Sequence, residues 1–327
     1  MMRVLVVKTS SMGDLIHTLP ALTDATHALG PIQFDWVCEP SFQEIPHWHP
    51  AVSDVLAIPL RTWRGRLHRL LFSDAFRAYK EALSTHTYDA VIDAQGLMKS
   101  AFLITRFTQG VRHGYALSSA REPLASLAYH RRYRISRDWH AISRIRHLFA
   151  EALGYSVPEQ APDASIDLGQ PVTQVNRIVL VTQTSRVHKC WPVAAWQQVI
   201  EQATERFDEV VLPAGTPAEQ RAVEQFMGHQ SVRVVAGATL TDVALELAGA
   251  RAVISVDTGL CHVADALGVP LLALYGPTSP GLVGPIGPQA QVIQSPTSEM
   301  SQIPAADVIR WLNAIDTASD AIHQGLS

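Results

Sequence analysis

Short apolar runs alternate with longer amphipathic segments along most of the chain. In the first half, the pattern predicts strands over residues 4–8, 34–37, 55–58 and 90–93, with helices over residues 14–29, 75–83 and 97–106. In the second half, it predicts strands over residues 178–182, 209–212, 232–235, 252–256 and 271–274, with helices over residues 193–205, 217–227, 241–247 and 259–266. Strands that alternate with helices in this way indicate parallel sheets covered by helices on both faces.

Two segments between these series have a different character. Residues 120–154 have a helical and basic pattern, and residues 157–176 contain three prolines and little periodicity, which is typical of a linker. A chain of 327 residues has room for two domains of ordinary size. We therefore predict an α/β protein with two Rossmann-like, doubly wound parallel-sheet domains, over residues 1–160 and 161–327, facing a central cleft. The C-terminal helix is free in this scheme to pack back on the N-terminal domain.

Composition restricts the class of protein. The chain is 47% hydrophobic and 17% charged, as in soluble globular proteins. Its three cysteines, Cys38, Cys190 and Cys261, match neither a disulfide framework nor a CxxC metal site, which favours a reducing compartment. No run approaches the roughly 20 apolar residues of a membrane span, and the start does not resemble a signal peptide. The N-terminal half is net basic, which fits either an acidic partner or a solvated basic face.

The first predicted strand ends in a turn over residues 8–14 that contains a glycine and a carboxylate. In doubly wound sheets, ligands bind outside the carboxyl ends of the strands, where such turns lie. Gly13 is a single glycine where a dinucleotide enzyme has GxGxxG, which argues against an NAD-dependent dehydrogenase. Asp14 stands at the start of the next helix, where a carboxylate acts either as a cap, worth roughly 1 kcal/mol, or as a catalytic group.

The first turn of the second half combines hydroxyl groups with an ammonium group. Thr184, Ser185 and Lys189 precede a helix that begins close to Pro192. Donors at a helix start suit a diphosphate, because they and the helix dipole both favour negative charge. A solvated Lys189 is the alternative explanation.

A later turn of the second half also follows a strand and opens a helix. Asp257 ends the strand, and Thr258 and Gly259 begin the helix, so that backbone N–H groups favour an anion there. The alternative is an ordinary capping turn with His262 as a core residue. No further ligands stand near His262 and Cys261 at the spacing of a metal site.

Taken together, these turns resemble family 9 of the glycosyltransferases, the ADP-heptose:lipopolysaccharide heptosyltransferases. The similarity extends over nearly the whole chain, and the stretches that carry it are residues 8–14 with 17–22, 88–97, 121–127, 188–189 with 191–192, and 255–262. Within the family, the opening Thr9-Ser10-Ser11-Met12-Gly13-Asp14 is most similar to the enzymes that add the first heptose.

The resemblance implies a GT-B architecture with the acceptor site in the N-terminal domain and the donor site in the C-terminal domain. It also implies inverting transfer of L-glycero-D-manno-heptose from ADP-heptose to the Kdo residue of Kdo-lipid A, in the lipopolysaccharide inner core. Asp14 falls on the catalytic aspartate of the family and would act as the general base, a role worth roughly 10² to 10⁴ in rate.

The residues that the resemblance assigns to the donor are Thr184, Ser185, Lys189, Glu219, Asp257, Thr258, Gly259 and His262. Lys189 would also assist catalysis by neutralising the diphosphate. Glu219 would accept hydrogen bonds from the ribose hydroxyls, although a solvated acid in the first turn of a helix explains it nearly as well. Neither a metal nor another cofactor is implied, because a lysine and a helix N-terminus meet the charge of the leaving group.

The residues assigned to the acceptor are Gly13, Arg61, Arg64, Lys99 and Arg121. Kdo carries a carboxylate and lipid A carries phosphates, which arginine binds bidentately. The Arg131-Arg132 pair is a candidate contact with anionic lipid headgroups. We expect a cytoplasmic protein that associates peripherally with the cytoplasmic face of the inner membrane and has no nucleic-acid partner.

Two departures and two alternatives accompany the resemblance. Cys190 and the run Arg186-Val187-His188 differ from the residues usual in the family's donor turn. A heptosyltransferase acting later in the core, or one using another ADP-hexose, is the alternative within the class. The alternative outside it is a nucleotide-sugar-binding protein without catalysis, which would have no need of a base at Asp14.

Overall fold

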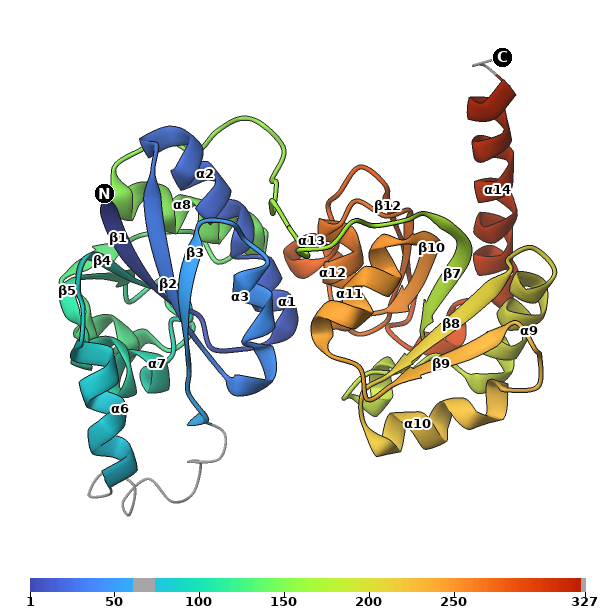
Figure 1. Cartoon of the computed structure of the whole chain (residues 1–327), viewed down its shortest axis with the longest axis horizontal. Helices are drawn as coiled ribbons and strands as arrows, with labels where there is room; N and C mark the ends of the chain where they lie inside the picture. Colours follow the sequence, from blue (N-terminus) through green and yellow to red (C-terminus); the bar gives the residue numbers. More distant parts are fainter. Residues whose placement is uncertain (61–73, 325–327) are drawn as a thin grey trace. The chain divides into compact units, whose positions relative to one another are not determined.

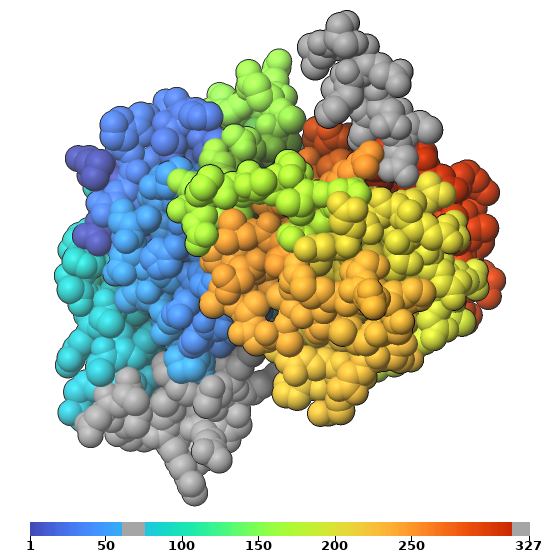
Figure 2. All heavy atoms as spheres, turned by 45° about the vertical axis from the view of Figure 1, so that its right-hand side comes forward, coloured from blue at the N-terminus to red at the C-terminus, as the bar shows by residue number. Residues whose placement is uncertain are grey.

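The computed structural model of the chain describes residues 1–60 and 74–324. It divides into two compact units, Met1–Gly169 and Gln170–Ser327, each built around one six-stranded sheet (Figure 1). All strand pairs in both sheets are parallel, so the prediction of two doubly wound α/β domains is confirmed. Figure 2 shows each unit as a continuous mass of atoms, blue to green for the first and yellow-green to red for the second.

The division between the units falls after Gly169, later than the predicted boundary between residues 160 and 161. Residues 161–169 belong with the first unit, because the Asp167 N–H donates to the carbonyl oxygen of Trp48 at 2.7 Å. Ala164 and Leu168 are buried in the same segment.

The first sheet has the strand order β3-β2-β1-β4-β5-β6. Its strands are β1 (Met2–Val7), β2 (Ile32–Cys38), β3 (Val52–Ala57), β4 (Thr87–Asp93), β5 (Gln109–Tyr115) and β6 (Arg131–Tyr133). The α-helices are α1 (Met12–Ile16), α2 (Leu19–Leu29), α3 (Glu44–His47), α6 (Asp74–Ser84), α7 (Met98–Leu103) and α8 (Ala141–Leu153). The 3-10 helices are η1 (Pro40–Phe42), η2 (Thr105–Phe107) and η3 (Pro123–Ala128).

The burial of the central strand explains why its apolar run could be predicted as a strand. Val4, Leu5, Val6 and Val7 of β1 are each 0% exposed, since both faces of a central parallel strand are covered. The chain crosses from β3 to β4 on the other side of β1, so the crevice expected for a ligand lies between the ends of β1 and β4.

The predicted single helix over residues 14–29 is wrong. Helix α1 begins at Met12 and ends at Ile16, and a second helix, α2, begins at Leu19. Pro20 stands in the first turn of α2, where its missing N–H is tolerated; inside a continuous helix it would remove a hydrogen bond and clash with the preceding turn.

The helical prediction for residues 120–154 is also wrong in part. The segment holds η3 and β6 before α8 begins at Ala141, and β5 precedes it without having been predicted. Strand β5 contains Gly110 and Gly114, which lower strand propensity. Gly114 is required there because a Cβ atom would overlap the ring of Tyr129.

The second sheet has the order β12-β11-β10-β7-β8-β9. Its strands are β7 (Val175–Val181), β8 (Glu209–Ala214), β9 (Val232–Ala236), β10 (Ala250–Val256), β11 (Leu271–Tyr275) and β12 (Ala290–Gln294). The α-helices are α9 (Val193–Thr204), α10 (Pro217–Val223), α11 (Leu240–Ala248), α12 (Gly259–Ala266), α13 (Pro280–Val283) and α14 (Ala305–Gln324). The 3-10 helices are η4 (Val187–Lys189), η5 (Glu224–Phe226) and η6 (Met300–Gln302).

Helix α14 begins in the core of the second unit. Val308 and Leu312 are buried there, and α14 packs against α9. None of the helices in the described ranges is both long enough and apolar enough to cross a membrane.

Candidate active site

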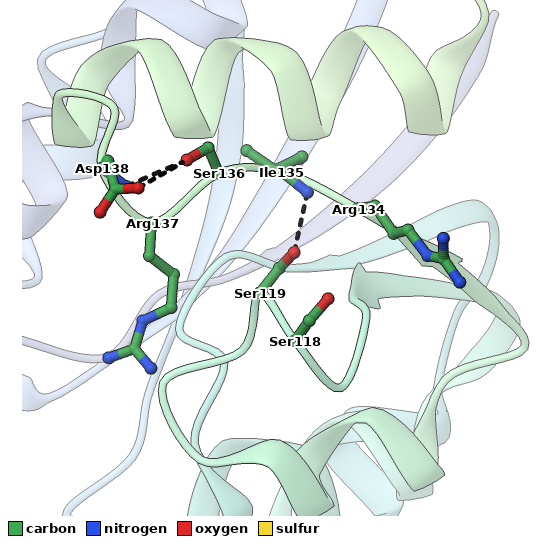
Figure 3. Close-up of a pocket in the computed structure, with 7 residues that line it drawn as sticks. All are labelled: Ser118, Ser119, Arg134, Ile135, Ser136, Arg137 and Asp138. Atoms are coloured by element: carbon green, nitrogen blue, oxygen red, sulfur yellow. Dashed lines mark hydrogen bonds between the residues drawn. The ribbon is translucent and has the colours of Figure 1, made fainter.

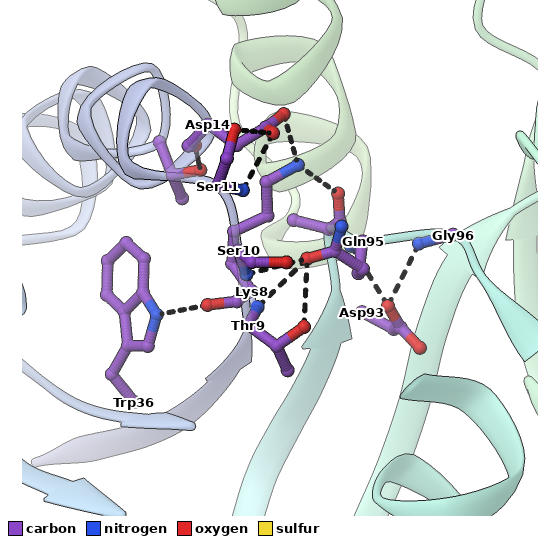
Figure 4. Close-up of polar contacts among 11 residues, drawn as sticks. Lys8, Thr9, Ser10, Ser11, Asp14, Trp36, Asp93, Gln95 and Gly96 are labelled. Atoms are coloured by element: carbon purple, nitrogen blue, oxygen red, sulfur yellow. Dashed lines mark hydrogen bonds and ion pairs between the residues drawn. The ribbon is translucent and has the colours of Figure 1, made fainter. Parts of the chain in front are cut away.

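The turn after β1 places a carboxylate beside a buried ammonium group (Figure 4). Lys8 Nζ lies 3.2 Å from Asp14 Oδ1 and donates a hydrogen bond to the carbonyl oxygen of Ala94 at 3.1 Å. The other carboxylate oxygen of Asp14 accepts hydrogen bonds from the backbone N–H and the hydroxyl of Ser11, both at 2.9 Å. The Asp14 side chain is 39% exposed, whereas that of Lys8 is 7% exposed. The carboxylate is therefore held from the protein side and open on the other.

These contacts set the charge state of Asp14. Burial alone disfavours its ionised form, but the Lys8 ammonium group, the two Ser11 hydrogen bonds and the charge of His17 outweigh burial and lower the pKa of Asp14 from 3.8 to about 2. The position also has the geometry of a capping acid, since Asp14 reaches back to the N–H of the residue before α1. Capping and catalysis are compatible, because the cap uses Oδ2, whereas Oδ1, which faces Lys8, has a lone pair left to accept a proton.

Gln95 joins the turn after β4 to the turn after β1. Its side-chain oxygen accepts hydrogen bonds from the Thr9 N–H at 2.9 Å, and from the Thr9 hydroxyl and the Ser10 N–H, both at 3.3 Å. Asp93 fixes Gln95 in turn, because its carboxylate accepts from the Gln95 N–H at 3.0 Å and from the Gly96 N–H at 3.1 Å. Complete burial raises the pKa of Asp93, against the effect of these hydrogen bonds.

The predicted acceptor residues lie in different parts of the first unit. Gly13 is buried in α1, next to Asp14. Lys99 lies in α7 and Arg121 is exposed, and the backbones around them are joined, since the Glu122 N–H donates to the Gly96 carbonyl oxygen at 3.1 Å. These two basic residues thus flank the turn after β4. Arg61 and Arg64 lie outside the described residues.

Lys189 and Asp257 of the second unit form an ion pair, although 68 positions separate them in sequence. Their side chains are 12% and 8% exposed. Lys189 ends η4 in the turn after β7, and Asp257 directly follows β10, which pairs with β7. The structure therefore brings together two of the predicted donor residues at neighbouring strand ends.

Helix α12 begins beside this ion pair. Thr258 is its N-cap, and the Thr258 side chain makes no capping hydrogen bond, so it leaves the N–H groups of the first turn, which starts at Gly259, to other acceptors. His262 is buried in α12 and has an interaction within the protein. A helix start with an adjacent lysine is suited to an anion such as a diphosphate.

The remaining predicted donor residues make no hydrogen bond or ion pair with the Lys189–Asp257 pair in the described part of the chain. Thr184 is half-buried and Ser185 is exposed in the loop that leads to η4. One carboxylate oxygen of Glu219 accepts a hydrogen bond from the Thr216 N–H at 2.9 Å, and the Glu219 N–H donates to the Thr216 hydroxyl at 3.2 Å. Glu219 therefore completes a capping box on α10, which leaves its other oxygen for a ligand.

Sequence reasoning did not assign Lys8 or Gln95 to the site. Both stand in stretches that resemble the family, but their roles depend on contacts with residues 86 positions away. The available signal was that Lys8 directly follows the buried end of β1 and Gln95 stands two residues after the buried end of β4. Among residues 1–60 and 74–324, no group of three or more His, Cys, Asp and Glu side chains is arranged to hold a metal ion.

Two parallel six-stranded sheets, each with polar and charged residues at its central strand ends, form a Rossmann-like α/β architecture with a ligand site where the strand order reverses. Residues 76–309 match the model of glycosyltransferase family 9 (heptosyltransferase). The chain belongs to glycosyltransferase family 9.

The most similar relatives carry one name. The chain is 45% identical to lipopolysaccharide heptosyltransferase 1 of Escherichia coli O18:K1:H7 (strain RS218 / NMEC), over 95% of this chain and 97% of that protein. It is 47% identical to lipopolysaccharide heptosyltransferase 1 of Pseudomonas aeruginosa, over 88% of this chain and 82% of that protein. The structure of E. coli heptosyltransferase WaaC with ADP matches with a TM-score of 0.89 at 44% identity, covering 96% of this chain and 100% of that one.

Replacing Lys8 with methionine is expected to raise the pKa of Asp14. The substitution removes the ammonium group while burial continues to disfavour the carboxylate. Because Asp14 would then become protonated at higher pH, the acid limb of the pH profile of kcat/KM should move upward. A ¹³C NMR titration of the Asp14 carboxyl group measures the pKa directly.

The matched control is Lys80→Met in the same unit, where the ammonium group lies over the rings of Phe76 and Phe107. This variant should leave the titration of Asp14 unchanged. An Asp14 pKa that stays near 2 in Lys8→Met would contradict the assignment of the shift to Lys8.

Proposed function

We propose that the chain transfers L-glycero-D-manno-heptose from ADP-heptose to the Kdo residue of Kdo-lipid A, with inversion, as the first heptose of the lipopolysaccharide inner core. The observation that carries the proposal is an ionised, solvent-accessible carboxylate at the end of β1 in a family 9 chain. The chain is similar over 95% of its length to a lipopolysaccharide heptosyltransferase 1, and this supports the choice of the first heptose over a later one.

Asp14 acts in this proposal as the general base. The Kdo hydroxyl oxygen attacks the anomeric carbon of heptose and forms the new C–O bond, while the bond from that carbon to the diphosphate oxygen breaks with its electron pair. The hydroxyl proton passes to the Asp14 carboxylate, and ADP leaves on the opposite face. Attack opposite the leaving group accounts for inversion at the anomeric carbon.

Lys189 and the start of α12 receive the developing charge on the diphosphate. The ammonium group of Lys189 is held by Asp257, so it lies in a fixed position before the donor binds. Thr258 and Gly259 present the N-terminus of α12 to the same anion, and Thr184, Ser185 and His262 complete the proposed donor contacts. Glu219 would bind the ribose with the carboxylate oxygen that does not cap α10.

The acceptor assignment is tested by a choice between two acceptors. Purified protein with ADP-heptose should transfer heptose to Kdo-lipid A at least tenfold faster than to the same acceptor already carrying its first heptose. Mass spectrometry of the products measures both rates. A preference for the heptosylated acceptor would show that the chain acts later in the core.

Asp14→Asn is expected to reduce kcat by about 10² to 10⁴ while ADP affinity changes little, because the amide cannot accept the proton. Transfer assays measure kcat, and isothermal titration calorimetry measures ADP binding. Asp242→Asn is a matched control, since Asp242 accepts from the N–H and the hydroxyl of Thr239 at 3.0 and 2.8 Å, as Asp14 does from Ser11.

The control variant should retain kcat, because Asp242 caps α11, which follows β9 at the edge of the sheet, two strands from β7 and three from β10. In the same experiment, Lys189→Met should weaken ADP binding by tenfold or more, as loss of a charge-assisted hydrogen bond predicts. It should also lower kcat, because Lys189 receives the charge that develops on the diphosphate. Turnover by Asp14→Asn close to the unsubstituted rate would exclude Asp14 as the base.

We propose further that the first unit contacts an anionic membrane surface. Leu124 and Leu127 of η3 are 53% and 57% exposed, one turn apart, and the exposed Arg131 and Arg132 follow in β6. Exposed apolar and basic side chains this close in sequence fit the boundary between headgroups and acyl chains, where each basic residue contributes about 1 kcal/mol.

Vesicle sedimentation tests this contact. Binding to phosphatidylglycerol-containing vesicles should exceed binding to phosphatidylcholine vesicles, and Arg131→Gln/Arg132→Gln should reduce the difference. Equal binding to the two kinds of vesicle would argue that the protein meets the membrane only through its lipid substrate.

A further inference from the structure

A depression of about 370 Å³ lies at the ends of β5 and β6 in the first unit. Its lining consists of Ser118, Ser119, Arg134, Ile135, Ser136, Arg137 and Asp138. Figure 3 shows Ser118 and Ser119 beneath the segment that follows β6, with the two arginines on either side of them. Two guanidinium groups and hydroxyl groups are the donors that bind phosphate and carboxylate oxygens.

The two arginines of this lining are not paired with other protein groups among the described residues. Within residues 1–60 and 74–324, neither Arg134 nor Arg137 has a hydrogen-bond or ion-pair partner. Some other described arginines of the unit do have partners; Arg146, for example, is paired with the buried Asp24 at 2.6 Å. Asp138 opposes an anion, but the Ser136 hydroxyl contacts its carboxylate at 3.4 Å, and one positive charge remains in excess.

The floor of the depression is fixed by hydrogen bonds between its two loops. The buried Ser119 hydroxyl accepts from the Ile135 N–H at 2.8 Å, and the Ala116 N–H donates to the Tyr133 carbonyl oxygen at 2.8 Å. Arg144 of α8 donates to the Ser119 carbonyl oxygen at 3.1 Å. A ligand would therefore meet a site whose backbone is already ordered, which lowers the entropic cost of binding.

The depression lies at the same edge of the sheet as Asp14. Both follow carboxyl ends of parallel strands, and with about 4.8 Å between neighbouring strands, the β5–β6 gap is about 12 Å from β1. The ring of His140, two residues after the lining, lies tilted with its centroid 5.8 Å from that of His17, whose charge acts on Asp14, so the two sites are on the same side of the unit.

We propose that this depression is a second anion subsite for the acceptor. It takes a phosphate or carboxylate group that lies beyond the sugar under attack, because the site is too far from Asp14 to hold a substituent of that sugar. The inference rests on the proposed function, and it adds Arg134 and Arg137 to the acceptor-binding residues. An anchor at this distance would orient the acceptor hydroxyl towards the base.

The test is equilibrium binding of deacylated acceptors to the full chain, measured by isothermal titration calorimetry, with transfer kinetics alongside. Arg134→Gln/Arg137→Gln should raise Kd and KM for the phosphorylated acceptor by about tenfold or more, with kcat little changed. Arg134→Lys/Arg137→Lys should recover part of the affinity, since it keeps the charge but not the bidentate geometry.

Three acceptors distinguish the source of the anion: a phosphorylated acceptor that carries two Kdo residues, the same acceptor without its phosphates, and a phosphorylated acceptor with a single Kdo. An effect that disappears with the dephosphorylated acceptor assigns the subsite to a lipid A phosphate. One that persists there but disappears with an acceptor bearing a single Kdo assigns it to the carboxylate of a second Kdo. Either outcome supports the subsite, whereas an equal effect on all three acceptors, or no effect, overturns it.

A charge-matched control separates local contact from general attraction. Lys80→Gln/Arg106→Gln removes the same charge beside Phe107, ahead of the amino end of β5 and at the opposite edge of the sheet. It should bind all acceptors as the unsubstituted chain does, and a matching loss of affinity would overturn the subsite. Absence of heptose transfer by the unsubstituted chain would contradict the proposed function. The binding measurements would still show whether the depression binds the anion.

Discussion

The ion pair between Lys8 and Asp14 is the interaction on which the organisation of the first unit's turns depends. Lys8 is buried, and a buried charge without a partner costs several kcal/mol, so the ammonium group requires the carboxylate close to the end of β1. The same ammonium group binds the Ala94 carbonyl oxygen, and Gln95 binds the backbone of Thr9. The turns after β1 and β4 therefore form one connected structure, and the position of Asp14 is set by both.

The second unit also has a largely buried lysine paired with a carboxylate, at the equivalent ends of its central strands. In each sheet the first strand is flanked by the second strand on one side and the fourth on the other, and the charged groups lie where the direction of the winding changes. There, Lys189 follows β7 and Asp257 follows β10, just as Lys8 follows β1 and Gln95 follows soon after β4. Parallel strands that end together thus gather polar residues from distant parts of the sequence.

This geometry explains what the sequence could and could not predict. Apolar runs such as that of β10 and the start of α12 at Gly259 were predictable, because burial and helix starts leave local patterns. Strand β5 is not predicted because its two glycines lower strand propensity; the structure requires them where a Cβ atom would overlap the Tyr88 backbone, at Gly110, or the Tyr129 ring, at Gly114. Pro20 indicates a helix start, but the apolar periodicity continues across it and predicts one unbroken helix. The local pattern indicated an anion site at the turn that holds Lys189 and at the turn that starts at Asp257, and the resemblance assigned the other donor and acceptor residues. The Lys189–Asp257 pair and the Gln95 contacts, by contrast, depend on tertiary structure that no local pattern encodes.

A carboxylate with a pKa of about 2 is a weak base, and this bears on how it would act in glycosyl transfer. In a transition state with oxocarbenium character, the bond to the leaving group is largely broken before the attacking hydroxyl loses its proton. As the new C–O bond forms, that hydroxyl becomes far more acidic than a free alcohol, so a weak base suffices at this late stage. The Lys8 contact meanwhile keeps Asp14 ionised at any pH near neutrality, so that the acceptor always meets the form that can take the proton.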